Sequence, residues 1–438
     1  MSRPAGTLFD GPIHFDASRL IARGVRSSPT GIDRVDLAYA RHLLDTGADL
    51  RPVAWLGGTL RTVEPAALAA YLQRLAGHWN GGTAADRAGP VAGEARIAGF
   101  LRGERVARYR PPTPPSPFGR LVRQAVGTAG GLADRTLTRD GFKPRPVFRP
   151  GPAGGTYLNV SHHHLEKPAL FAALGPAPQT VIFVHDLIPI DHPEYCRPGD
   201  DAKHRARMRN VVAHADRVLV NSAFTADRLQ AFAATCGKVD LPVTVAPLGI
   251  DRPPPADAAP FPAARPYFVT VGTIEARKNH LLLLNIWRRL AETLGPDAPR
   301  LVVIGRRGWE IEAVIDMLER SPPLEDTVLE TGPVGDCLLA RLMAGARALL
   351  MPSFTEGFGL PVAEALAAGV PVIASDIPAH REIAGTVPEL LDPLDGPAWI
   401  RAVTDYAADP SDRRAAQTAR MADYRAPDWA RHFRLAHI

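Results

Sequence analysis

Cysteine, lysine and long apolar runs are all scarce in this sequence. Its 3 cysteines are widely spaced and form no Cys-x-x-Cys pair, which is typical of reduced thiols and argues against a disulfide framework or a zinc site. No apolar run approaches the roughly 18 residues of a membrane-spanning helix. The first residues also lack the charged start and apolar stretch of a signal peptide. We therefore expect a cytoplasmic location.

The composition excludes a disordered, fibrous or coiled-coil chain. Glycine and proline, at 38 and 43 residues, are too few to indicate low-complexity disorder. Hydrophobic residues make up 46% and charged residues 22%, as in ordinary globular proteins. A chain of 438 residues exceeds what one hydrophobic core usually supports, so we expect two domains.

Positive charge is concentrated in one stretch of the chain. Between Arg96 and Arg149, twelve Lys or Arg stand against three acidic residues, although the whole chain carries a net charge of only +5. Such a stretch indicates an anionic partner, either a membrane surface or a lipid-linked substrate. The alternative is a solvated insertion rich in Pro, Gly and Arg. On the first interpretation the protein would lie peripherally on the inner face of a membrane.

Short apolar strands alternate with helical patterns, and this predicts an α/β protein with doubly wound, Rossmann-like domains facing a cleft. The expected organisation is an acceptor-side domain over 1–250 with the basic insertion at about 80–155, a proline-rich linker over 251–265, a nucleotide-binding domain over 266–410, and a C-terminal helical segment over 411–438. Strands are expected at 13–15, 50–55, 156–160, 181–184, 218–220, 243–246, 267–271, 301–304, 327–329, 348–351 and 370–374. Helices are expected at 32–44, 97–109, 121–137, 223–229, 280–294, 310–318, 337–346, 360–368 and 424–433.

The segment 351–364, MPSFTEGFGLPVAE, is the most informative motif. A strand ends, glycines allow close backbone approach, and Pro361 opens a helix whose free N–H groups suit a phosphate. Glu356 and Glu364 each carry a carboxylate that can clasp a sugar diol. The alternatives are a tight turn for the glycines and a helix-dipole partner for Glu364.

A second motif, GTIEARKN over 272–279, follows the first strand of the same domain. Arg277 and Lys278 stand just ahead of a helix, where two cations oppose the helix dipole unless an anion lies between. A diphosphate leaving group would remove that conflict.

Together these two motifs resemble the retaining glycosyltransferases of family 4, which have the GT-B fold. The resemblance implies that Glu356 contacts the hexose, Glu364 the ribose, and Arg277 and Lys278 the diphosphate. It implies a donor site that also includes Gly272, Thr273, Gly357, Phe358, Gly359 and Leu360. Many family members carry Arg where this chain has Thr273, and Arg277 would then supply that charge. The fold holds the diphosphate without a metal, and no Asp-x-Asp motif or cofactor motif is found, so we expect no metal and no cofactor.

In the first domain, His185 follows a strand and matches the family's active-site histidine, with Asp186 orienting it or the acceptor. A buried structural histidine is the alternative. Gly31, Asp33 and Arg34 resemble the family's acceptor-side loop, although an ordinary helix cap explains them equally well. His162 would face the substrate. The run of three histidines at 162–164 is a poor zinc site, because neighbouring side chains on an extended chain point in opposite directions.

The expected function is transfer of a hexose, with retention, from a nucleotide diphosphate sugar to a glycan or lipid-linked acceptor in bacterial surface polysaccharide synthesis. The catalytic set would be His185, Glu356, Lys278 and Arg277. The segment 304–309 beside the GTIEARKN motif resembles bacterial O-antigen mannosyltransferases, which favours GDP-mannose as donor. The alternatives are an epimerase or phosphorylase of the same fold, or a non-catalytic scaffold. A dehydrogenase is disfavoured by the lack of GxGxxG after either first strand, and a nucleic-acid partner by the lack of a recognition motif.

Overall fold

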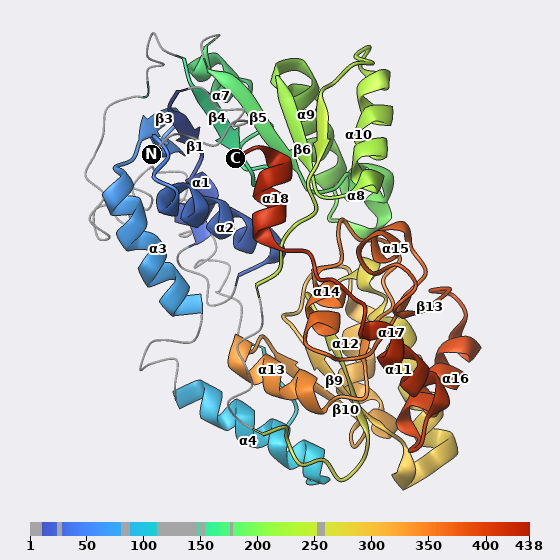
Figure 1. The fold of residues 1–438 in the computed structure, drawn as a ribbon. Coiled ribbons are helices and arrows are strands. Elements are labelled where there is room, and N and C mark those ends of the chain that lie inside the picture. Colours follow the sequence, from blue (N-terminus) through green and yellow to red (C-terminus); the bar gives the residue numbers. More distant parts are fainter. Residues whose placement is uncertain are drawn as a thin grey trace.

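The computed structural model describes residues 11–23, 29–79, 88–111, 148, 154–175, 178–251 and 259–438. They form two parallel sheets, one in each half of the molecule (Figure 1). The first sheet has the order β1-β4-β5-β6-β7. Its strands are β1 (Ile13–Phe15), β4 (Thr156–Asn159), β5 (Gln179–Val184), β6 (Arg217–Val220) and β7 (Val243–Val245).

The second sheet has the order β10-β9-β8-β11-β12-β13. This is the strand order of a Rossmann domain, in which the direction of winding reverses between the first and fourth strands. The reversal lies between β8 and β11, and ligands of such sheets bind at that point, beyond the carboxyl ends of the strands. The strands are β8 (Tyr267–Val271), β9 (Arg300–Ile304), β10 (Val328–Gly332), β11 (Leu349–Met351), β12 (Val372–Ser375) and β13 (Glu389–Leu391). The two Rossmann-like halves confirm the predicted α/β class.

Helices connect the strands and cover both faces of each sheet. In the first half they are α1 (Ser18–Arg23), α2 (Gly31–Asp45), α3 (Pro65–Trp79), α7 (Pro168–Leu174), α8 (Ile188–Asp191), α9 (Asp200–His214) and α10 (Ala223–Thr235). In the second half they are α11 (His280–Leu294), α12 (Glu312–Arg320), α13 (Asp336–Gly345), α14 (Leu360–Ala367), α15 (Pro378–Ala384), α16 (Gly396–Ala407) and α17 (Asp412–Met421). Single-turn 3₁₀ segments lie at Pro193–Tyr195, Ala276–Lys278, Gly295–Asp297 and Pro322–Leu324.

The strand expected at 50–55 is a hairpin instead. β2 (Val53–Leu56) pairs antiparallel with β3 (Thr59–Thr62), and residues 50 and 53 make only isolated bridges to the β1 segment. Gly57 and Gly58 have φ values of 55° and 82°, the left-handed pair that a two-residue hairpin turn requires. The Gly-Gly dipeptide was therefore a turn signal that the prediction overlooked.

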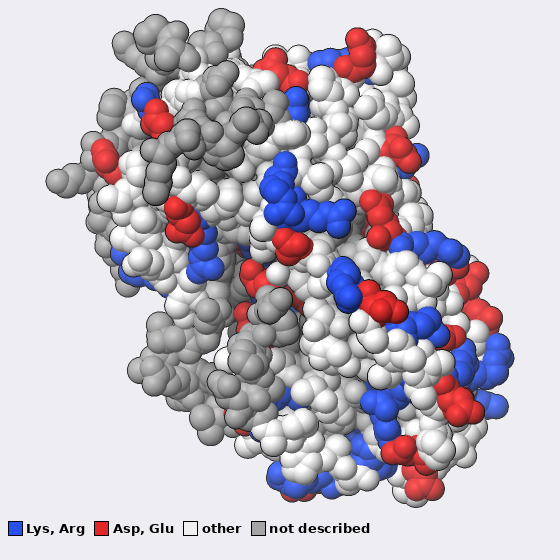
Figure 2. Space-filling model, in the orientation of Figure 1, with Lys and Arg blue, Asp and Glu red and all other residues white. Residues whose placement is uncertain are grey.

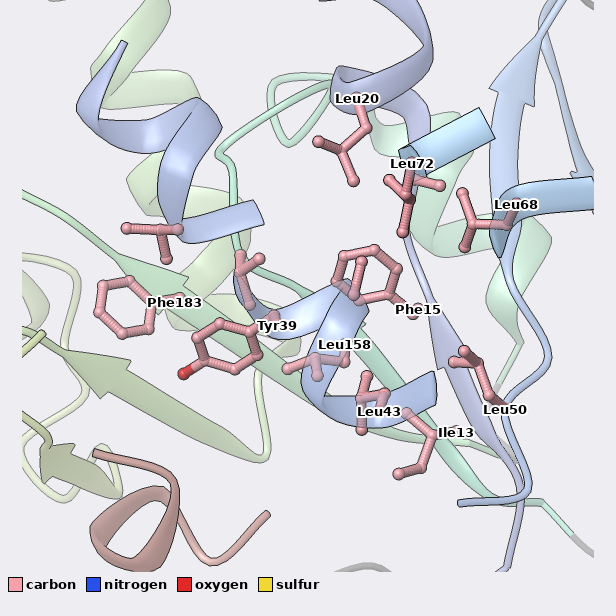
Figure 3. Close-up of a cluster of buried hydrophobic side chains, with 14 of the residues drawn as sticks. Ile13, Phe15, Leu20, Tyr39, Leu43, Leu50, Leu68, Leu72, Leu158 and Phe183 are labelled. Atoms are coloured by element: carbon pink, nitrogen blue, oxygen red, sulfur yellow. The ribbon is translucent and has the colours of Figure 1, made fainter. Parts of the chain in front are cut away.

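Apolar side chains fill both faces of the first sheet. Figure 3 shows the core on one face, where Phe15 and Leu158 from two strands meet Tyr39 and Leu43 of α2. α3 closes the same core with Leu68 and Leu72, which are fully or almost fully buried. Because these side chains are buried, the strands are held in place. The residues that follow each strand are therefore held in place as well.

One segment from the first half of the sequence packs on the second half of the molecule. α4 (Ala88–Arg102) lies beside β10, with Ile97, Phe100 and Leu101 in the core of the second sheet (Figure 1). The prediction placed the whole region 80–155 with the first domain, so the structure differs there. It also differs from the predicted helix 97–109, because Gly103 has a φ of 99° and ends α4. The expected helix 121–137 and much of the proline-rich linker lie outside the described residues.

The chain then returns to the first half at its far end. α18 (Trp429–Ala436) inserts Phe433 and Ala436 into the core around α2, whereas the preceding helix, α17, packs on the second half. Within the described ranges, no helix has the length and apolarity to cross a membrane. Figure 2 shows Lys and Arg side chains interspersed with Asp and Glu on one face, rather than a surface of one sign.

Candidate active site at the junction of the two halves

Glu356 lies at the reversal point of the second sheet, in the loop between β11 and α14. Only 6% of the residue is exposed. Its Oε1 accepts a hydrogen bond from Ser353 Oγ at 2.7 Å and forms a close ion pair with Lys278 Nζ. Its Oε2 forms an ion pair with Nη1 of Arg277 at 2.6 Å. The two predicted motifs, almost eighty residues apart in sequence, therefore meet at one carboxylate.

Arg277 is anchored by a second carboxylate that the prediction did not include. Its Nη2 forms an ion pair with Oε1 of Glu275 at 2.6 Å. Its Nη1 also donates a hydrogen bond to the carbonyl oxygen of Thr355 at 3.1 Å. A guanidinium has five N–H donors, so at least two remain for another ligand. Glu275 lies two positions before Arg277 in the same motif, and an alternating charge pattern at a strand end could have signalled it.

The acidity of Glu356 follows from these neighbours. Burial opposes its ionisation, but the positive charges of Arg277 and Lys278 outweigh burial and hold the pKa of Glu356 well below its usual range. Burial is the largest effect on Lys278 and lowers the pKa of its ammonium, although Glu356 acts in the opposite direction. Each member of the pair therefore shifts the pKa of the other in the direction that favours its charged form.

The glycine loop after Glu356 lies directly on the first half of the molecule. A Cβ placed on Gly357 would come within 2.9 Å of the carbonyl oxygen of His185, so only glycine allows this approach. Phe358 is buried in the core of the first half, and Gly359 begins α14 with a φ of 96°. Pro361 is the second residue of that helix. The first backbone N–H groups of α14 thus lie at the junction of the two halves, where they could bind a phosphate.

Glu364, in the first turns of α14, faces charges from both halves. Arg34 of α2 pairs with Asp336 of α13 at 2.8 Å, and both are electrostatic neighbours of Glu364. Burial is the main cause that raises the pKa of Glu364 to about 7, while Arg34 acts against it. Arg34, predicted on the acceptor side, therefore lies beside the predicted ribose carboxylate. Gly31 packs near Leu360, at 3.4 Å from a Cβ placed on Gly31.

His185 is a buried histidine at the end of β5. Its Nε2 lies 2.7 Å from the carbonyl of Val160, and its backbone N–H donates to Nε2 of His162 at 3.0 Å. Burial lowers the pKa of His185 to about 4, so its imidazole is neutral at physiological pH. Asp186, the next residue, accepts a hydrogen bond from the N–H of Ile188 and lies against Gly357.

Asp33 is placed as a helix cap. It is fully buried and accepts hydrogen bonds from the N–H and hydroxyl of Thr30 at 2.8 and 2.7 Å, which completes a capping box at the start of α2. Arg19 donates to it at 2.7 Å. Its carboxylate is saturated by these partners, so the structure favours the cap over contact with an acceptor.

The three consecutive histidines form a turn and not the extended chain that was expected. His162 and His164 have positive φ values of 59° and 63°. Across the ranges that the structure covers, no group of three His, Cys, Asp or Glu side chains has the arrangement of a metal site. His162 is 6% exposed, and its Nε2 accepts a hydrogen bond from the backbone N–H of His185.

Several residues that close the junction could be found only in the tertiary structure. Glu382 of α15 accepts hydrogen bonds from the N–H groups of Ala223 and Phe224, the first amides of α10, at 2.5 and 3.2 Å. Tyr195 and Phe354 stack with their centroids 5.3 Å apart. No spacing in the sequence links these pairs, because each joins the two halves.

A family model named Glycosyl transferases group 1 matches residues 265–409. These residues form a glycosyl transferases group 1 domain. The group 1 domain contains β8, β11, α14 and both site motifs, so the identification rests on the same residues as the geometry.

Two curated relatives each match less than half of this chain. The serotype-specific mannosyltransferase WbdA of Escherichia coli is 33% identical over 221 residues, which are 46% of this chain and 26% of that protein. The O-antigen chain mannosyltransferase B of E. coli is 34% identical over 163 residues, 37% of this chain and 42% of that protein. The chain thus matches about a quarter to two fifths of the length of these relatives.

Solved structures show the fold of the whole chain. Anabaena Alr3699/HepE in complex with UDP-glucose superposes with a TM-score of 0.58 at 15% identity, covering 97% of this chain and 98% of that one. Sucrose-phosphate synthase from Thermosynechococcus elongatus gives a TM-score of 0.53 at 15% identity, covering 98% of both chains. The fold is GT-B, as the motif resemblance implied.

Proposed function

We propose that this protein is a retaining, metal-independent glycosyltransferase that moves a hexose from a nucleoside diphosphate sugar to a glycan or lipid-linked acceptor. The observation that carries the proposal is the cluster of Glu356, Arg277 and Lys278 at the reversal point of a group 1 domain. A carboxylate that can hold sugar hydroxyls is there within bonding distance of two cations that can hold a diphosphate.

The N-terminus of α14 supports an anionic ligand at this point. Glu275 and Glu356 neutralise Arg277 and Lys278, so the four side chains carry no net charge. A bound diphosphate adds negative charge, which the N-terminal amides of α14 are placed to offset. Thr273 carries no charge, so we assign to Arg277 the positive charge that many family members have at the position of Thr273.

In the proposed reaction the acceptor hydroxyl oxygen bonds to C1 of the hexose on the face from which the C1–O bond to phosphate breaks. Its proton passes to the departing phosphate oxygen, giving the glycoside and a nucleoside diphosphate. Arg277 and Lys278 stabilise the charge that develops on the leaving group, which is usually the largest electrostatic contribution to such a step. Neutral His185 borders the reacting carbon from the first half, and Glu364 holds the ribose.

Mannose from GDP-mannose is the donor that we favour. The support is that WbdA and the O-antigen chain mannosyltransferase B of E. coli, two of the relatives, are mannosyltransferases. The structural neighbour HepE binds UDP-glucose, which makes a uridine donor the competing case. On the acceptor side we assign Gly31, Arg34, Asp186 and His162. We place the reaction in the cytoplasm, at the inner face of a membrane that the basic stretch would contact, in surface polysaccharide synthesis.

Nucleotide binding and turnover test the proposal together. Calorimetry with GDP and UDP is expected to show tighter binding of GDP, and GDP release from GDP-mannose with a glycan acceptor is expected in the presence of EDTA. Lys278→Ala should lower turnover about a hundredfold or more, because one donor to the developing charge is lost. Lys238→Ala is the matched control, since Lys238 is bonded to the carbonyl of Val212 in the first half.

The anomeric configuration of the product, read by NMR, tests retention. Tighter binding of UDP than of GDP would contradict GDP-mannose as the donor, but it would not contradict the proposed glycosyl transfer. Turnover by Lys278→Ala equal to that of Lys238→Ala would remove Lys278 from the mechanism. A requirement for a divalent cation would contradict metal independence.

A further inference from the structure

The segment 93–111 is built into the group 1 domain although it lies outside the residues that the family model matches. Arg96 donates to the carbonyls of Glu330 and Thr331 at 2.9 and 3.3 Å, at the end of β10. The carbonyl of Leu101 accepts the N–H of Ala264 at 2.9 Å, just before the domain begins. These contacts hold the segment along the edge strand of the sheet, with its last residues at the carboxyl end.

Tyr109, near the end of this segment, lies against Gly332 at the end of β10. A Cβ placed on Gly332 would come within 2.6 Å of the tyrosine ring, so a side chain at that position would displace the ring. The Arg96 guanidinium lies 5.9 Å from the ring centroid and fixes its position. Among the described residues, no group hydrogen-bonds the Tyr109 hydroxyl, and the ring is half-buried.

Three glycines form a row across the carboxyl ends of the strands, with Lys278 at one end and Tyr109 at the other. Gly305 donates to the carbonyl of Gly332 at 3.1 Å, and a Cβ placed on Gly305 would lie 1.8 Å from the carbonyl oxygen of Gly272. A Cβ placed on Gly272 would lie 3.6 Å from Lys278 Cε. Two strand spacings separate β8 from β10, which is about 10 Å.

We propose that Tyr109 forms the base end of the nucleotide site and contributes to the choice of base. The inference rests on the proposed function, in which the diphosphate lies at Lys278. The row lies at the carboxyl ends of the strands, which is where ligands of such sheets bind. A nucleoside that starts at Lys278 and follows this row reaches Tyr109 with its base. A tyrosine ring can stack on a base, and its hydroxyl can bond the base edge.

The loop after β10 also supports a nucleoside that runs from Lys278 towards Tyr109. It leads from Gly332 to Asp336, which pairs with Arg34 beside Glu364, the proposed ribose ligand. The segment 332–336 therefore joins the proposed base position to the proposed ribose position. The family domain supplies the residues proposed for the diphosphate and the ribose, and the segment from outside it supplies Tyr109.

Calorimetry with Tyr109→Ala tests the inference, with GDP, UDP and inorganic pyrophosphate as probes. Loss of stacking is expected to weaken the preferred nucleoside diphosphate about tenfold or more. Pyrophosphate, which has no base, should bind as tightly as to the native protein. Tyr109→Phe should keep most of the affinity, because the ring remains. Val106→Ala is the control, since Val106 packs in the same segment and away from the glycine row.

Different outcomes separate this inference from the proposed function. Unchanged nucleoside diphosphate affinity in Tyr109→Ala, with only a lower Tm, would overturn the role of Tyr109 alone. Equal weakening of pyrophosphate, or the same loss in Val106→Ala, would show that the segment acts only by holding the domain together and would also overturn it. No binding of any nucleoside diphosphate by the native protein would overturn both.

Discussion

Glu356 and Glu364 are eight positions apart, yet their pKa values are displaced in opposite directions. Two cations hold the pKa of Glu356 low, whereas burial raises the pKa of Glu364 to about 7 against the opposing effect of Arg34. The difference comes from burial and from the neighbouring charged groups. Neighbouring carboxyls with separated pKa values are typical of sites that bind or react with ligands.

Glu364→Gln is expected to change how stability depends on pH. The folded pKa of about 7 lies above the ordinary 4.5, so the native state holds a proton that the unfolded chain releases over this range. The contribution of Glu364 is therefore fully present below about pH 4.5 and is lost as pH rises to 7. Glutamine mimics the protonated form, so the variant should gain on the order of 2 kcal/mol over the native protein between these limits.

Urea unfolding at pH 4.5 and 7.5 measures this difference. Glu312→Gln, on the exposed face of α12, serves as the control. Parallel pH profiles for the native protein and Glu364→Gln would show that Glu364 has an ordinary pKa in the folded state.

At the scale of elements, α18 joins the end of the chain to the first half. Phe433 stacks on His42 with centroids 3.7 Å apart and meets Tyr39 edge-on at 5.1 Å. His432 contacts the Tyr39 hydroxyl at 2.7 Å and the carbonyls of Ala246 and Pro247. A helix of eight residues has little stability alone, so these contacts, and not its propensity, hold it in place.

Phe433→Ala should destabilise the protein by about 3–5 kcal/mol, the usual cost of removing a buried aromatic ring. Phe433 is 4% exposed, whereas Leu435 on the same helix is 37% exposed. Leu435→Ala should therefore change the unfolding free energy by less than about 0.5 kcal/mol. Urea unfolding of both variants checks the pair, and similar costs would mean that α18 is not docked as described.

At the scale of the molecule, the chain alternates between the halves. Residues 11–79 lie in the first half, 93–111 in the second, 154–251 in the first, 259–421 in the second and α18 in the first. Ion pairs and stacked rings then join the facing edges. The group 1 domain is consequently not self-contained, because part of its core comes from α4.

Acid should destabilise the whole protein because many histidines are buried in the neutral form. Burial lowers the pKa of His163 and His280 to about 3, and of His164, His185 and His432 to about 4. The unfolded chain binds these protons below pH 6.5 and the native state does not. Stability is therefore full above about 6.5 and falls as pH drops towards 4. Asp16, Asp36 and Glu364 act in the opposite direction, but they are fewer.

His280→Leu isolates one of these histidines. His280 is 4% exposed, and its Nδ1 has no partner among the described residues. Removing the imidazole should reduce the slope of stability against pH by about one proton between pH 4 and 6. Urea unfolding of the variant and the native protein at pH 4, 5, 6 and 7.5 gives the free energy of unfolding at each pH, and hence its slope against pH. A slope equal to that of the native protein would show that His280 is protonated in the fold.

The sequence alone determined the alternation of strands and helices and the edge on which the motifs lie. The bounds of β8 and α11 were predicted to the residue, because an apolar run and a helical period are local properties. Since carboxyl ends of parallel strands share one edge, the two motifs were bound to lie near one another. The candidate residues themselves could therefore be named in advance.

Only the tertiary structure decided which partners those residues have. In the folded chain, Asp33 accepts the hydrogen bonds of a helix cap, and Phe358 is buried in the core of the opposite half. α4 packs beside β10 in the core of the second half. Each outcome depends on surfaces supplied by residues that are distant in sequence. Burial and charge pairing are properties of such surfaces, and a local pattern carries no information about them.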